Sequence, residues 1–210
     1  MPPKSVRRPR LPAARADGTV LKTTIINDRD GIPVVVEVIQ GNLLTINSQA
    51  IVNAANATLK GGGGVDGQIH RKAGPELAAE IRAKYPNGCR VGDARLTDAY
   101  SITSARHIIH AVGPTWNKAN GADNRDVKED LRRAYINSLG QATLGEDASI
   151  AFPTISTGIF GYPPEEAAQV AMRAVREFLH KENNPWLRKI TFLIWGTDSA
   201  DEQFYMAHFE

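Results

Sequence analysis

Four short apolar runs dominate this chain, and none of them alternates between apolar and polar residues. Strands with one solvated face alternate in that way, whereas strands covered by helices on both faces are apolar throughout. Helix-length segments separate the runs. The pattern therefore predicts an α/β fold, namely a three-layer α/β/α sandwich with a mixed, centrally parallel sheet. The runs are Ala50 to Ala54, His107 to Val112, Ser149 to Pro153 and Lys189 to Trp195.

Two further strands and four helices complete this prediction. Leu21 to Ile26 and Pro33 to Ile39 flank a turn at Asn27 to Gly31, whose D-R-D-G sequence favours a hairpin and an antiparallel start to the sheet. Amphipathic spacing, with proline or acids near the starts, predicts the helices. They are Pro75 to Lys84, Asp126 to Leu139, Pro164 to His180 and Asp201 to Phe209.

Length and composition favour one domain, which we place at residues 19–210. A chain of 210 residues with 42% hydrophobic residues is long enough for a single buried core. No apolar run approaches the roughly 18 residues that cross a bilayer, so we expect a soluble protein with no membrane partner. Cys89 is the single cysteine, which excludes an internal disulfide and fits a reducing, cytoplasmic or nuclear location.

Residues 1–18 are predicted to form a flexible basic arm. Its first 16 residues carry a charge of +5 and no acid, so the remaining chain carries +2 − 5 = −3. Such an arm also fits organelle targeting or a weak nucleic-acid contact, but prolines interrupt the amphipathic helix of a presequence, so we favour a solvated tail. The basic residues are Lys4, Arg7, Arg8, Arg10 and Arg15, and the prolines are Pro2, Pro3, Pro9 and Pro12.

A four-glycine loop, Gly61 to Gly64, follows the apolar run that begins near Ala50. Glycines lack Cβ, so their main-chain N–H groups can approach a ligand closely, and a loop that opens a helix suits a diphosphate. A plain flexible connection is the alternative. Asn56 and Asp66 bracket the loop at fixed offsets, and this favours the diphosphate cradle.

A second loop, Ser156 to Gly161, also follows a predicted strand and offers amides to the same anion. No lysine follows the glycines as in a P-loop, and no G-x-G-x-x-G opens a dinucleotide fold. We expect no metal, because the histidines show no ligand spacing with cysteine or acid. They are His70, His107, His110, His180 and His208.

Three motifs resemble those of the macrodomains, specifically the MacroD-type branch that hydrolyses ADP-ribose esters. The first is V-N-A-A-N followed by G-G-G-G-V-D-G-x-I-H, within Ile51 to His70. The second joins Val91 to Tyr100 with His107 to Pro114, and the third is Ile150 to Pro163. The likeness covers residues 34–205. It implies a macrodomain-like fold without a cofactor.

The resemblance implies that Asn56 and Asp66 form the catalytic pair. In the MacroD-type enzymes the matching residues contact the distal ribose, and the aspartate orients the attacking water together with the ligand diphosphate. This would release ADP-ribose from modified aspartate or glutamate side chains and deacetylate O-acetyl-ADP-ribose. The alternative for Asp66 is that it caps a helix starting near Gly67. We expect Asn53 to brace its strand end and His70 to pack in its helix.

The remaining site residues are expected to bind substrate. Phe160 would cover the distal ribose, with loop packing as the alternative, and Trp195 would stack on adenine, with a core position as the alternative. Asn42 stands where the family usually has an aspartate that accepts from adenine. The predicted substrate-binding residues are Gly41, Asn42, Leu43, Ala54, Gly62, Gly63, Gly64, Val65, Ser156, Thr157, Gly158, Ile159, Phe160 and Trp195.

Two other functions fit the same pocket. A binding module would recognise ADP-ribose without cleaving anything, and a phosphatase would act on ADP-ribose 1″-phosphate. The carboxylate of Asp66 favours hydrolysis, because a reader needs the phosphate cradle but not the acid. The expected partners are ADP-ribose, its esters and mono-ADP-ribosylated proteins.

Overall fold

The computed structural model describes residues 18–116, 125–182, 184–195 and 200–208. These residues contain a seven-stranded sheet with the strand order β1-β2-β7-β6-β3-β5-β4. The predicted basic arm lies outside the described residues, except that Gly18 is the first residue of β1. The strands are β1 Gly18–Asn27, β2 Pro33–Gly41, β3 Ala50–Ala54, β4 Ala94–Asp98, β5 His107–Ala111, β6 Ser149–Phe152 and β7 Lys189–Ile194.

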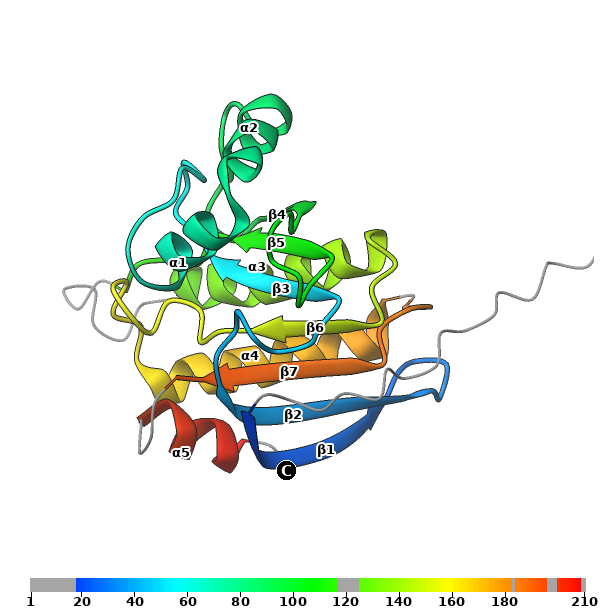
Figure 1. Cartoon of the computed structure of the whole chain (residues 1–210). Coiled ribbons are helices and arrows are strands. Elements are labelled where there is room, and N and C mark those ends of the chain that lie inside the picture. The colour runs from blue at the N-terminus through cyan, green and yellow to red at the C-terminus, as the bar shows by residue number, and fades with distance from the viewer. Residues whose placement is uncertain (1–17, 117–124, 183, 196–199, 209–210) are drawn as a thin grey trace, which may run out of the picture.

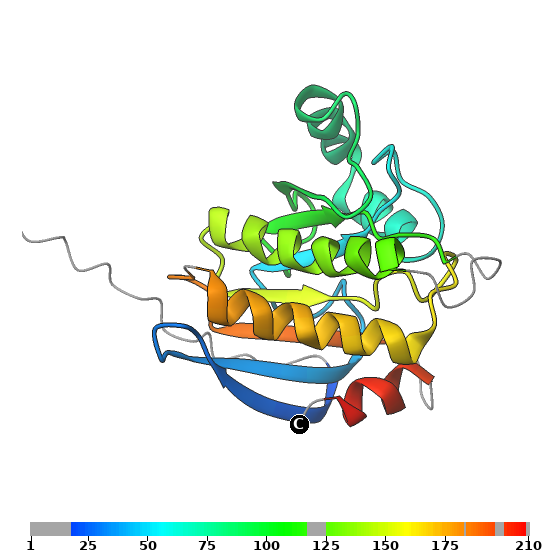
Figure 2. The same cartoon turned by 180° about the vertical axis from the view of Figure 1, so that it is seen from behind.

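Helices cover both faces of the sheet, which confirms the three-layer prediction. Figure 2 shows α3, α4 and α5 on one face, where they share a core with Phe152 and Phe192. On the other face α1 and α2 pack on Ile51 and Ile108 (Figure 1). The helices are α1 Gly64–Ala73, α2 Pro75–Lys84, α3 Arg125–Leu144, α4 Pro164–Lys181 and α5 Ala200–Ala207. None of them is long and apolar enough to cross a membrane within the described ranges.

The five central strands are parallel, and the two edge strands are antiparallel to their neighbours. β2, β7, β6, β3 and β5 pair in parallel, whereas β1 pairs with β2 and β4 pairs with β5 in the antiparallel sense. The sheet is therefore mixed and centrally parallel, as predicted. The carboxyl ends of the parallel strands meet at one edge of the sheet, which is where ligands bind in folds of this type.

Strand β4 was not predicted, because its sequence lacks a continuous apolar run. Only Ala94 and Thr97 of this strand are buried, and Asp98 is exposed. An edge strand is covered on one side only, so it tolerates charged residues that a central strand excludes. α3 also extends beyond the predicted end through Gly140 to Leu144. Ala142 is buried against the sheet core, and this packing outweighs the low helix propensity of glycine.

Candidate ligand-binding and active site

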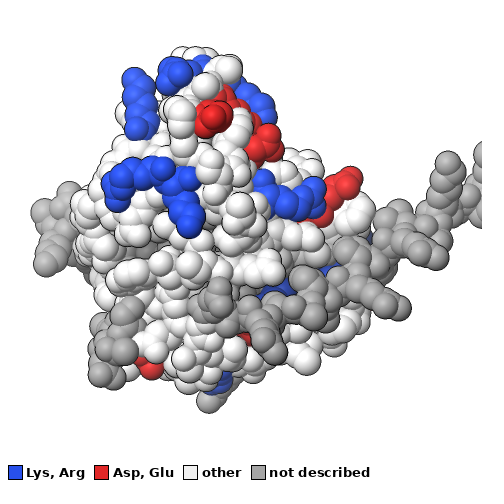
Figure 3. All heavy atoms as spheres, viewed as in Figure 1, with Lys and Arg blue, Asp and Glu red and all other residues white. Residues whose placement is uncertain are grey.

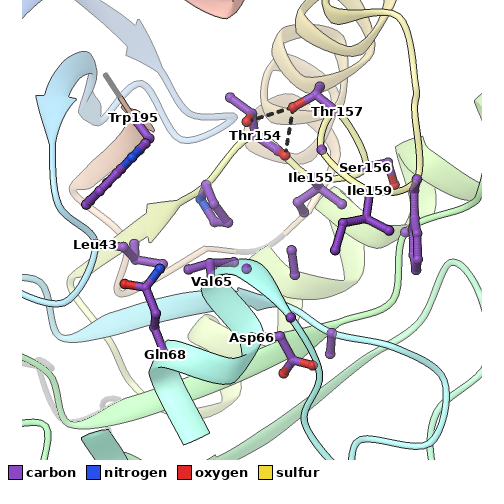
Figure 4. A pocket seen from close by; sticks show the side chains of 18 of the residues that line it. Leu43, Val65, Asp66, Gln68, Thr154, Ile155, Ser156, Thr157, Ile159 and Trp195 are labelled. Atoms are coloured by element: carbon purple, nitrogen blue, oxygen red, sulfur yellow. Dashed lines mark hydrogen bonds between the residues drawn. The ribbon is translucent and has the colours of Figure 1, made fainter. Parts of the chain in front are cut away.

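A cleft of about 670 Å³ opens at the carboxyl ends of the parallel strands. Its volume lies in the range of small-molecule sites, roughly 300 to 1,000 Å³. The glycine loop between β3 and α1 forms one wall, and the loop from Pro153 to Phe160 after β6 forms the other. All sixteen site residues predicted from the sequence line this cleft. Figure 4 shows Trp195 near one end of it and Asp66 near the other.

Eight further residues line the cleft without having been predicted. Gln68 is the most informative, since it lies on α1 one turn after Gly64, and Figure 4 shows its amide beside Leu43 and Val65. Helical spacing from the glycine loop was the signal that could have found it. The eight residues are Leu44, Ala55, Gln68, Gly113, Pro153, Thr154, Ile155 and Leu193.

Asp66 is the third residue of α1, which begins at Gly64, earlier than predicted. Gly63 occupies the N-cap, and no side chain caps the helix, so the capping interpretation of Asp66 is wrong. The first N–H groups of a helix have no intrahelical acceptor, and its positive end favours nearby anions. The start of α1 therefore presents both main-chain donors and a positive field to the cleft.

The carboxylate of Asp66 is 5% exposed and is held from several sides. Asn53 Nδ2 donates to Oδ1 over 2.7 Å, and His70 Nε2 lies 3.4 Å from the same oxygen. The other oxygen, Oδ2, lies 3.4 Å from Asn56 Nδ2. Asn53 was expected to brace its own strand end, and its hydrogen bond to Asp66 on α1 was not predicted. His70 is packed, but its contact with Asp66 was not predicted.

Asn56 ties the glycine loop to the end of β3. Its Nδ2 donates to the Gly61 carbonyl over 2.8 Å, and its Oδ1 accepts from the Thr58 N–H at 3.0 Å. A Cβ placed on Gly62 would lie only 3.1 Å from Asp66 Oδ2 and 3.3 Å from Asn56 Nδ2. The glycine therefore allows the loop to run directly over both predicted catalytic side chains.

The second loop is closed by one hydrogen bond within it and is tied by another to the segment after β5. The Tyr162 N–H donates to the Ser156 carbonyl over 2.9 Å, and the Trp116 N–H donates to the Phe160 carbonyl over 2.8 Å. Ser156 has a φ of +69°, which is unfavourable for a residue other than glycine and is often found at functional sites. Its buried Oγ has no partner among the described residues.

The opposite end of the cleft is formed by Trp195 and the turn after β2. Trp195 follows the last residue of β7 and is 69% exposed, so its alternative position in the core is wrong. Asn42 Oδ1 accepts from the Leu44 N–H at 2.9 Å. That carbonyl oxygen already holds the turn and has one lone pair left for a further donor.

Glycines and uncharged residues form most of the two loops that line the cleft. Asp66 is the single charged residue among those that line it, and they include no lysine or arginine. Figure 3 shows lysines and arginines gathered outside the cleft, over the part of the molecule formed by α1 and α2. Arg71, Lys72, Arg82 and Lys84 on these helices are exposed. Lys84 is paired with Glu80 on the same helix, and Figure 3 shows acids among these basic side chains.

The sequence from Val52 to Ala171, more than half of the chain, matches the model of the family described as Macro domain. The chain belongs to this family. Solved macrodomains agree in fold. The Oceanobacillus iheyensis macrodomain with ADP has a TM-score of 0.73 at 32% identity, over 89% of this chain and 94% of that chain. The Trypanosoma brucei macrodomain in complex with ADP-ribose has a TM-score of 0.69 at 36% identity, over 82% and 68%.

Two curated relatives of this macrodomain carry enzyme names. A Salmonella typhimurium protein named O-acetyl-ADP-ribose deacetylase is 43% identical over 166 residues, which are 78% of this chain and 89% of that protein. A Xenopus laevis protein named ADP-ribose glycohydrolase MACROD2 is 46% identical over 156 residues, which are 74% of this chain. The match covers 36% of MACROD2, so this chain corresponds to about a third of that protein.

Burial, together with the nearby His70, lowers the pKa of His110 in this macrodomain to about 3. An unfolded histidine titrates near pH 6.5. Between these values the unfolded chain binds a proton that the folded chain does not. His110 therefore lowers the free energy of unfolding as the pH decreases, by at most about 1.4 kcal/mol per pH unit. We predict that His110→Gln loses less stability than wild type between pH 7 and pH 5, as measured by urea unfolding. Equal losses would contradict this.

Cys89 is buried, and burial raises the pKa of its thiol to about 11. The thiolate is the nucleophilic form of cysteine, and this environment disfavours it. Cys89 does not line the cleft. Its buried position away from the cleft indicates a structural role.

Proposed function

We propose that this macrodomain is an ADP-ribosyl ester hydrolase that releases ADP-ribose from mono-ADP-ribosylated aspartate or glutamate side chains and deacetylates O-acetyl-ADP-ribose. The observation that carries the proposal is one buried carboxylate, Asp66, beside two main-chain loops in a single cleft. Relatives with enzyme names and solved macrodomains with ADP or ADP-ribose support the same ligand.

The diphosphate binds between the two loops. The N-terminus of α1 and the loop Ser156 to Phe160 supply N–H donors, and the lining contains no competing lysine or arginine. Adenine then stacks on the exposed ring of Trp195 at one end. The distal ribose lies at the other end, next to Asn56, Asp66 and Phe160. The cleft thus offers separate places for a base, a diphosphate and a second sugar.

Asp66 and an oxygen of the bound diphosphate hold the attacking water at the ester linkage. Water adds across this linkage as the ester C–O bond breaks: one product receives its hydroxyl group and the other its hydrogen. The products are a free carboxylic acid and ADP-ribose, with no change of oxidation state. A carboxylate that orients or deprotonates water in this way contributes roughly a hundredfold to ten-thousandfold.

Release of free ADP-ribose tests the proposal. The protein is incubated with a protein modified on aspartate or glutamate, or with O-acetyl-ADP-ribose, and ADP-ribose is followed by chromatography. A calorimetric titration with ADP-ribose runs in parallel. Release from either substrate supports the hydrolase. Binding of ADP-ribose without any release would favour the binding module over the hydrolase. Absence of binding would show that ADP-ribose is not the ligand.

Trp195→Ala is expected to weaken ADP-ribose binding about tenfold. Stacking of a base on an aromatic side chain contributes roughly 1 to 3 kcal/mol, and 1.4 kcal/mol corresponds to a tenfold change in Kd. Calorimetry gives the Kd directly. Leu144→Ala is the control, because Leu144 is a similarly exposed apolar residue, 77% exposed, outside the cleft. An unchanged Kd for Trp195→Ala would place adenine elsewhere.

A further inference from the structure

Three polar side chains cross the sheet in a row that ends at Asp66. Thr97 on β4, His110 on β5 and Asn53 on β3 are each 0% exposed. Asn53 and His110 are direct partners across the parallel pair β3 and β5. Burying polar groups costs free energy unless their hydrogen bonds are satisfied, and apolar residues would fill this space without that cost. The row therefore calls for a role beyond packing.

The distances define one consistent set of donors and acceptors. Asn53 Nδ2 lies 2.7 Å from Asp66 Oδ1 and 3.1 Å from His110 Nδ1. An amide nitrogen has two hydrogens, so Asn53 can donate to both. His110 Nδ1 then accepts, and its protonated Nε2 donates to Thr97 Oγ1 at 3.0 Å. The Thr97 hydroxyl in turn donates to the Ile108 carbonyl at 3.5 Å.

The opposite orientation of the Asn53 amide is excluded by Asp66. It would place Asn53 Oδ1 2.7 Å from a carboxylate oxygen, and both atoms are acceptors only. In the observed orientation Asn53 Oδ1 has no hydrogen-bond partner among the described residues, so this oxygen does not fix the orientation of the amide. The orientation is fixed by the two acceptors on either side of Nδ2. One of them is His110, whose neutral form is favoured by its burial.

We propose that Asn53 and His110 are positioning residues for the hydrolysis: His110 accepts at Nδ1 and thereby holds the Asn53 amide in the orientation that fixes Asp66. Asn53 anchors Oδ1 of Asp66. The other carboxylate oxygen, Asp66 Oδ2, then faces Asn56 and the nearby Gly62 in the cleft wall. This inference rests on the proposed role of Asp66. His70 is the other group beside Oδ1, at 3.4 Å, so a carboxylate released by Asn53 would turn toward it.

The test compares kcat with ADP-ribose affinity in variants of the full chain. Asn53→Leu removes both donations and is expected to lower kcat on the order of 10- to 100-fold with Kd changed less than threefold, because misplacing a catalytic group by about 1 Å costs up to a hundredfold. His110→Phe is expected to lower kcat about tenfold. His110→Gln restores an acceptor and should recover most of that loss.

Two controls separate positioning from stability. Ile109→Val lies beside His110 on β5 and is also fully buried, so it should lower Tm and leave kcat unchanged. In the Asp66→Ala background, Asn53→Leu should cause no further loss of kcat. A wild-type kcat in Asn53→Leu, or equal loss with Gln and Phe at position 110, would overturn the inference while the hydrolase proposal stands. Failure of the wild type to release ADP-ribose would instead end the hydrolase proposal.

A spectroscopic measurement needs no variant. In protein labelled with ¹⁵N-histidine, His110 should show an unprotonated Nδ1 and a protonated Nε2 at every pH from 8 to 5. This tautomer is the one that lets Asn53 donate to the ring. A protonated Nδ1, or titration of His110 in this range, would overturn the inference whether or not the variants fold.

Discussion

Asp66→Ala is expected to lower kcat for ester hydrolysis by about a hundredfold to ten-thousandfold, the range for general-base help. ADP-ribose should still bind, because the proposed phosphate donors are main-chain N–H groups that the substitution leaves in place. The carboxylate is buried at the distal end of the cleft and bonded on one oxygen by Asn53, so it is held in a fixed position. Single-turnover release of ADP-ribose and calorimetry measure the two effects separately.

Asp98→Ala is the matched control for this prediction. Asp98 is an exposed carboxylate at the end of edge strand β4 and does not line the cleft, so its removal should leave kcat unchanged. If Asp66→Ala hydrolysed the ester as fast as wild type, the water would have to be held by another group. The assignment of Asp66 would then be wrong even though the ligand was right.

Gly67→Ala is expected to raise the Kd for ADP-ribose at least tenfold and to destabilise the fold by about 1 to 3 kcal/mol, the usual range for an overpacked site. A Cβ at Gly67 would lie 2.3 Å from the Gly62 carbonyl oxygen. That contact is with backbone, so the glycine loop must move away from α1. The loop forms one wall of the cleft, where we propose that the diphosphate binds, so binding should be lost together with stability.

Helix propensity alone predicts the opposite sign, since alanine is more favourable than glycine in a helix by roughly 1 kcal/mol. Gly140→Ala measures the contribution of helix propensity alone. Gly140 lies within α3, and a Cβ there would meet no atom within 4 Å, so this substitution should stabilise the protein. Urea unfolding of both variants checks the contrast. A stabilised Gly67→Ala variant with normal binding would show that the loop tolerates the displacement.

The main elements of the fold were readable from local patterns. Apolar runs such as Ala50–Ala54 lacked polar alternation because helices cover both faces of the central strands. Strand β4 was missed for the converse reason, because half of an edge strand faces solvent and its sequence carries charges. The start of α1 was placed too late, since Asp66 is a common cap residue and the sequence does not show that Gly63 takes that position.

The sequence by itself determined the layer order, the two glycine-containing loops and the identity of sixteen residues that line the cleft. Those features depend on local periodicity and on glycine, which act over short stretches of chain. Only the tertiary structure decided what surrounds Asp66. Asn53, His110 and Thr97 come from three strands, and their hydrogen-bond directions follow from the register between those strands, which the sequence does not encode locally. The same holds for Trp195, whose 69% exposure the sequence alone left open between a core and a surface position.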